Sequence, residues 1–114
     1  MKKSIVIFAL FALTLLTLIS CASDPMAELP AGNKISESVS TEGTYKLELY
    51  LCVQSGTQYI RGAVTTVATG EVKNIYWDVY TDTMNIEWTG DTTVKVNDRS
   101  LNVTTDVYDC REAE

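Results

Sequence analysis

The sequence predicts a small all-β domain, an antiparallel meander of five to six strands that follows a signal peptide and a flexible tether. After Gly43, β-branched and aromatic residues alternate with polar residues at a period of two, which is typical of half-buried strands. Short turns separate these stretches, and no segment beyond Gly43 has helical periodicity. The pattern leaves open whether the sheet packs as a sandwich or curls into a partly open barrel.

The first predicted strand covers residues 45–53 and has one apolar face. That face carries Tyr45, Leu47, Leu49, Leu51 and Val53. The opposite face carries Lys46, Glu48, Tyr50 and Cys52. Because successive side chains of a strand point to opposite sides, the first set predicts the core side of the sheet.

Five further strands follow, each reached through a turn of a few residues. They are expected at residues 58–67, 72–80, 85–88, 93–97 and 101–103. Glycines at positions 56, 70 and 90 mark three of the turns. This spacing favours hairpin connections over crossovers through helices.

The N-terminal residues 1–20 have the layout of a bacterial signal peptide. Lys2 and Lys3 supply a positive start, and an apolar stretch of about fifteen residues follows. That stretch is shorter than the roughly 20 residues of a membrane-spanning helix. We therefore expect export rather than a permanent membrane helix.

The signal peptide ends in Leu18-Ile19-Ser20-Cys21, which resembles the bacterial lipobox. The resemblance implies cleavage before Cys21 and a diacylglyceryl thioether on that cysteine. Two acyl chains hold a protein stably on a membrane, whereas one holds it only marginally. The expected location is the outer face of the bacterial cell membrane, and the alternative is cleavage near Ala22 to give a free secreted protein.

Residues 21–42 are expected to form the tether and residues 43–114 the β domain. The segment after Cys21 is rich in Ser, Glu, Gly and Pro, with breakers at Pro25, Pro30 and Gly32. As a flexible coil it would span roughly 25 Å. A short helix around residues 33–39 is the alternative for its second half.

Charge and cysteine content limit the partners of the domain. The whole chain has 9 basic and 15 acidic residues, and loss of Lys2 and Lys3 leaves a net charge of about −8. This acidity argues against nucleic acid or anionic lipid as a partner of the domain surface. With Cys21 lipidated, Cys52 and Cys110 remain as an even pair that could form a disulfide or stay as two thiols.

The chain contains no histidine, which removes the usual general base and most catalytic zinc sites. Carboxylates at positions 78, 82, 87 and 91 are expected to form a solvated acidic face rather than a calcium site. Tyr76 and Tyr80 share one strand face and could present a stacking platform for a peptide or sugar. The alternative is that these aromatics pair across strands to stabilise the sheet. No cofactor or metal is expected.

Several stretches together resemble a family of small exported firmicute proteins known only as a domain of unknown function. They are Glu42-Gly43-Thr44-Tyr45, Arg61-Gly62, Asn74-Ile75-Tyr76-Trp77, Ile86-Glu87-Trp88, residues 91–97, Leu101-Asn102-Val103 and Asp106-Val107-Tyr108-Asp109. The resemblance implies a small β domain without an assigned activity.

The expected function is a membrane-anchored lipoprotein with a non-catalytic β domain. Such a module would bind a peptide, a wall polymer or a protein partner, or serve an envelope-associated structural role. The alternative is a carboxylate-dependent hydrolase of envelope material. That enzyme would need two acidic side chains facing one cleft at roughly 5–10 Å.

Overall fold

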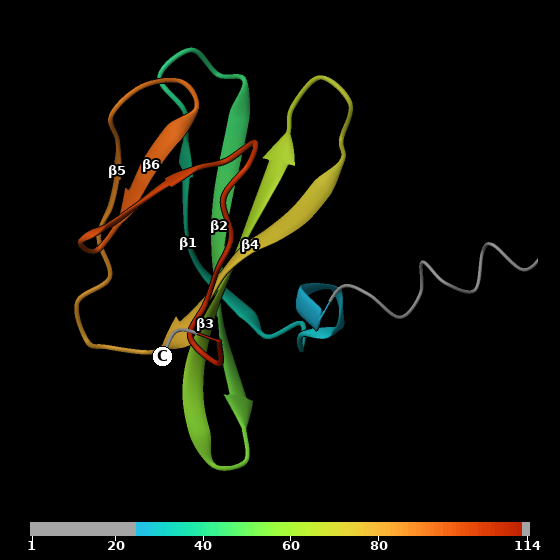
Figure 1. The fold of residues 1–114 in the computed structure, drawn as a ribbon, viewed down its shortest axis with the longest axis vertical. Coiled ribbons are helices and arrows are strands. Elements are labelled where there is room, and N and C mark those ends of the chain that lie inside the picture. The colour runs from blue at the N-terminus through green and yellow to red at the C-terminus, as the bar shows by residue number, and fades with distance from the viewer. Residues whose placement is uncertain (1–24, 113–114) are drawn as a thin grey trace, which may run out of the picture.

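A computed structural model describes residues 25–112, which fold into eight strands and one 3-10 turn (Figure 1). The elements are η1 (Pro25–Glu28), β1 (Asn33–Val39), β2 (Tyr45–Gln54), β3 (Thr57–Thr66), β4 (Val72–Val79), β5 (Ile86–Trp88), β6 (Thr93–Val96), β7 (Arg99–Asn102) and β8 (Tyr108–Asp109). One sheet has the order β1-β2-β3-β4-β8 and the other β5-β6-β7. The all-β prediction is confirmed, and the sheets are not closed into a barrel.

Strands β2 and β3 form the long hairpin at the centre of the larger sheet. Gln54 pairs with Thr57, so only Ser55 and Gly56 form the loop. Both loop residues have positive φ, 54° and 81°. This conformation is that of a type I′ turn, whose twist matches the twist of the flanking strands.

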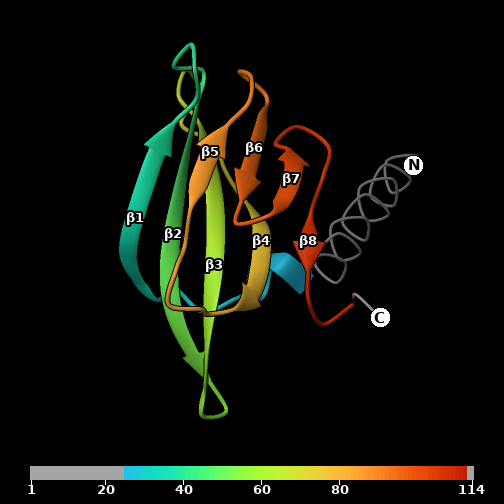
Figure 2. The ribbon, with the colours of Figure 1, turned by 90° about the vertical axis from the view of Figure 1, so that its left-hand side faces the viewer.

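The two sheets stack face to face and enclose the main core (Figure 2). The larger sheet contributes Leu47, Leu49, Ile60, Val64, Ile75 and Tyr76, and the smaller sheet and its end contribute Val94, Val96, Leu101 and Val103. The predicted apolar face of the first strand is confirmed at Leu47 and Leu49, which are fully buried. The alternative of a sandwich, left open by the sequence, is the one the fold adopts.

A third layer covers part of the other face of the larger sheet. Figure 1 shows η1 on the side of this sheet that faces away from β5 and β6. Met26 of η1 packs there against Cys52 and Trp77 in a second, smaller core. We call the face that carries Trp77 the outer face.

The prediction of a flexible tether over residues 21–42 is wrong from residue 25 onward, and the predicted start of the domain at residue 43 is too late. β1 pairs antiparallel with β2 from Asn33 to Val39, so a strand, and no helix, occupies that part. β1 was missed because it is an edge strand whose side chains are mostly exposed, so its sequence lacks an apolar alternation. Residues 1–24 lie outside the described part.

The meander prediction is correct for the antiparallel pairs but wrong at the C-terminus. β8 pairs parallel with β4, through Tyr76 with Tyr108 and Trp77 with Asp109. A strand of two residues is too short to show a period in the sequence. Within residues 25–112 no helix is long and apolar enough to cross a membrane.

Candidate functional site

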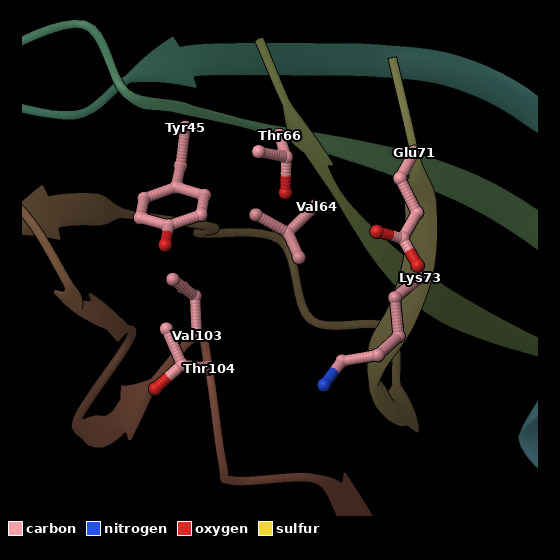
Figure 3. A pocket seen from close by; sticks show the side chains of 7 residues that line it. All are labelled: Tyr45, Val64, Thr66, Glu71, Lys73, Val103 and Thr104. Atoms are coloured by element: carbon pink, nitrogen blue, oxygen red, sulfur yellow. The ribbon is translucent and has the colours of Figure 1, made fainter. Parts of the chain in front are cut away.

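An open cleft between the two sheets is the first candidate site (Figure 3). Its volume is about 210 Å³, and it is lined by Tyr45, Val64, Thr66, Glu71, Lys73, Val103 and Thr104. β2, β3 and β4 supply one wall, and the chain after β7 supplies the other. Buried valines 64 and 103 form its apolar part, and the remaining side chains form a polar rim.

The cleft is smaller than the 300–1,000 Å³ of ordinary small-molecule pockets. Glu71 is its single carboxylate and Lys73 its single ammonium, and both residues are exposed. Such a site can hold one side chain or one sugar unit through a small apolar contact and a few polar groups. The charged groups that it offers to a bound molecule are the Glu71 carboxylate and the Lys73 ammonium.

Arg61 forms a clamp on the outer face. Its guanidinium donates to the carbonyl oxygens of Pro30 at 2.9 Å and Ala31 at 2.7 Å, and to Asn74 Oδ1 at 2.8 Å. It also stacks over the Tyr50 ring, 4.2 Å from the ring centre. These contacts occupy the guanidinium, so Arg61 fixes the N-terminal segment rather than offering an anion site.

Asn74 completes the clamp from the neighbouring strand. Its Nδ2 donates to the carbonyl oxygen of Met26 at 2.7 Å while its Oδ1 accepts from Arg61. Two adjacent strands therefore bind the backbone of the segment at three residues, Met26, Pro30 and Ala31. A hollow of about 420 Å³ remains between this segment and β4, with Leu29, Val72 and Lys73 among its lining residues.

A third hollow, of about 260 Å³, lies where β4 meets the loop between β6 and β7. It is lined by Tyr76, Asp78, Val96, Asn97, Asp98 and Arg99. The Tyr76 hydroxyl donates to Asp78 Oδ2 at 3.2 Å, and Asp78 Oδ1 accepts from the Val79 amide at 2.8 Å. Burial and the nearby Asp78 carboxylate raise the pKa of Tyr76 well above its usual range.

The predicted stacking platform of Tyr76 and Tyr80 is wrong. Tyr76 is only 2% exposed and belongs to the main core, and Tyr80 packs half-buried against that core. A bulge in β4 places Gly62 opposite Tyr76 and Ala63 opposite Asn74, so Ile75 is the extra residue. Ile75 and Tyr76 both enter the main core as a result, which the simple alternation could not show.

Of the two alternatives that the sequence left open for Cys52 and Cys110, the structure has the two free thiols and not the disulfide. Both pack in the second core, but β3 and β4 lie between β2 and the end of β8. Three strand spacings amount to about 14 Å, twice the Cα separation that a disulfide tolerates. Burial raises the pKa of both thiols.

Asp91, one of the four carboxylates singled out in the sequence, has a structural role. Its Oδ1 accepts from Ser40 Oγ at 2.6 Å and from the Glu42 amide at 2.8 Å, and so ties the smaller sheet to the loop before β2. The Ser40 hydrogen bond lowers the pKa of Asp91. Among residues 25–112 no group of three His, Cys, Asp or Glu side chains could hold a metal ion.

The Arg61 clamp was not predicted from the sequence. The only signal was an arginine between Ile60 and Gly62, inside a strand, where a charge is unusual and needs partners. Its partners are Pro30, Ala31 and Asn74, which no local pattern connects to Arg61.

Two stacked open sheets with a small cleft between them and a clamped N-terminal segment define a small β-sandwich domain. The chain belongs to a family of unknown function, DUF5412, whose model matches residues 2–113. The expectation of a domain of unknown function is thereby confirmed. Searches of curated proteins and of solved structures gave no match.

Proposed function

We propose that the protein is an exported bacterial lipoprotein, cleaved before Cys21 and held by lipid on that cysteine at the outer face of the cell membrane. Its β domain serves as a non-catalytic binding or envelope-associated structural module. The observation that carries the proposal is the lipobox-like Leu18-Ile19-Ser20-Cys21, placed four residues before the first described residue of the domain. A lipid anchor followed directly by a small sandwich suits a module that works at the membrane surface.

The chemistry of the clefts supports a binding role. The chain has no histidine, and the cleft between the sheets combines one carboxylate with one ammonium. Its size suits a single side chain of a peptide or protein, or one sugar of a wall polymer. The acidity of the chain, with 15 acidic against 9 basic residues, disfavours nucleic acid.

A carboxylate-dependent hydrolase is the second candidate, because Asp78 and Asp98 line the same hollow. Retaining and inverting glycosidases need two free carboxyl groups facing one cleft. Both oxygens of Asp78 already accept hydrogen bonds, from Tyr76 and Val79, which makes it a poor base or nucleophile. Release of sugar from envelope material by the wild type, with loss in both Asp78→Asn and Asp98→Asn, would favour the enzyme.

The anchor is tested with Cys21→Ser in the full chain. Wild-type protein should fractionate with membranes and give an N-terminal peptide that carries the mass of two acyl chains on Cys21. The Cys21→Ser variant should lose the lipid and leave the membrane fraction while keeping the same far-UV spectrum. A mature N-terminus without lipid would overturn the anchor.

The cleft is tested with solubilised wall fragments and with short peptides as probes, added to the isotope-labelled Cys21→Ser protein. Binding should shift backbone amide signals of Val64, Val103 and Thr104, and Lys73→Ala should weaken the shifts. Lys95→Ala, which changes a lysine of the smaller sheet, is the matched control. Shifts that gather elsewhere on the domain would exclude this cleft.

A further inference from the structure

The N-terminal segment leaves the domain from a fixed place on the outer face. Met26 is only 5% exposed against the second core, and the Arg61 and Asn74 side chains bind the backbone of residues 26, 30 and 31. The segment is therefore part of the fold from its first described turn. The point where a lipid anchor would join the domain is set by these contacts rather than by a loose coil.

Chain length then limits how far the domain can lie from the lipid. Four Cα-to-Cα steps separate Cys21 from Pro25. Fully extended, they span at most about 14 Å, which is roughly half the reach of the flexible coil expected from the sequence. A sandwich whose two sheets alone are about 10 Å apart cannot turn freely on so short a connection.

The outer face exposes several apolar side chains, as expected of a surface that lies against lipid. Val39, Val72 and Val79 pair with Lys46, Thr65 and Tyr59, which places all three valines on this face. They are 52%, 59% and 48% exposed. The hollow beside η1 adds Leu29 to this partly apolar surface.

Both lysines of β1 and β2 on the outer face form ion pairs, whereas the opposite layer is acidic. Lys34 contacts Glu37 at 2.7 Å and Glu48 at 3.0 Å, and Lys46 contacts Glu48 at 3.7 Å. Residues 81–107, which form the smaller sheet and its loops, carry five acidic and two basic side chains. An anionic membrane surface therefore repels the smaller sheet more than the outer face.

We propose that the outer face lies against the lipid surface and that the smaller sheet faces away from it. The proposal rests on the lipid anchor at Cys21 and adds a defined orientation to it. The lipid surface is the partner of the outer face. The short connection to Cys21, and not charge attraction, holds this face against the lipid. The cleft between the sheets then lies at a fixed short height above the bilayer.

The two tryptophans of the chain report this orientation, because they lie on opposite sides of the larger sheet. Trp77 is in the second core under η1, and Trp88 packs against the main core and donates to Ser38 Oγ at 3.1 Å. Trp88→Phe leaves Trp77 as the donor, and Trp77→Phe leaves Trp88. Each lipidated variant is placed in phosphatidylcholine and phosphatidylglycerol vesicles containing a dansyl-labelled lipid as energy acceptor.

Trp77 should transfer more energy to the dansyl lipid than Trp88. A flexible insert of about 12 residues between Asp24 and Pro25, adding roughly 20 Å of reach, should remove most of the difference. Equal or reversed transfer in the two variants without the insert would overturn the orientation. Flotation of each variant with the vesicles is scored separately, so a missing anchor is distinguished from a wrong orientation.

Amide hydrogen exchange of the protein that keeps both tryptophans provides a second measurement, in case Trp77→Phe does not fold. On vesicles, compared with the Cys21→Ser protein in solution, exchange should slow at residues 27–31 and around Val72. Residues 81–107 should exchange at the same rate in both states. Protection confined to residues 81–107 would contradict the proposal.

Discussion

Gly62 lies directly opposite Tyr76, and a Cβ atom at Gly62 would come within 2.9 Å of the Tyr76 Cβ. The contact lies in the main core, where Leu49 is the next neighbour at 3.3 Å. β3 and β4 can approach this closely here only because residue 62 has no side chain.

Replacement of Gly62 by alanine should therefore destabilise the fold. The added methyl group overpacks a closed core, and we expect a loss of about 1–3 kcal/mol in the free energy of unfolding. Urea denaturation of the Cys21→Ser protein measures it. Gly90→Ala is the control, because a Cβ there meets nothing within 4 Å. Equal midpoints for the two variants would show that the Gly62 contact relaxes freely.

Loss of the clamp should loosen the N-terminal segment more than the sheets. Asn74→Ala removes the donor to Met26 O and one acceptor of Arg61, which should cost about 1–3 kcal/mol because two part-buried hydrogen bonds are lost. Limited proteolysis should then cut within residues 25–32 first. The control variant Lys95→Ala should leave the cleavage pattern unchanged. An unchanged pattern in Asn74→Ala would show that the clamp does not hold the segment.

The two thiols should react as free, slow thiols. Cys52 is buried and Cys110 half-buried, and burial raises the pKa of each above the ordinary 9.0. Native Cys21→Ser protein should therefore take up iodoacetamide slowly, Cys110 before Cys52, and the same protein unfolded should take up two labels quickly. Peptide mapping without reductant gives the decisive outcome: a linked Cys52–Cys110 peptide would contradict the free thiols.

Acid should weaken the link between the smaller sheet and the loop before β2. The Ser40 hydrogen bond lowers the pKa of Asp91 below its ordinary 3.8 in the folded state. Its contribution to stability is complete above pH 3.8 and is lost as the pH falls toward the lowered pKa. Asp91→Asn should lower the melting temperature near pH 7 and reduce its fall below pH 4. Asp82→Asn, at an exposed turn residue, should follow the wild type.

Alkaline pH should destabilise the fold in part through the hydroxyl group of Tyr76. Its pKa is raised by burial above the ordinary 10.0, so the unfolded state loses the hydroxyl proton first. The contribution is complete below pH 10.0 and is lost as the pH rises above it. Tyr76→Phe should show a smaller loss of melting temperature between pH 10 and 12. An identical alkaline fall in both proteins would assign it to other groups.

The sequence by itself determined the elements whose apolar period survives in the fold. Alternation through Leu47 and Leu49 identified β2 and its core side, and the glycines at 56, 70 and 90 located turns between strands. Both signals are local, because a strand face and a turn conformation are each dictated by a few neighbouring residues.

Only the tertiary structure decided what covers each face. β1 contains Ser36 and Ser38 and has no apolar pattern. It forms as an edge strand because pairing with β2 supplies its stabilising contacts. Arg61, Asn74 and Met26 meet across long stretches of chain, and the bulge at Ile75 turns Tyr76 into a core residue. These outcomes depend on which segments become neighbours in space, and that choice is made by packing the whole chain around two small cores.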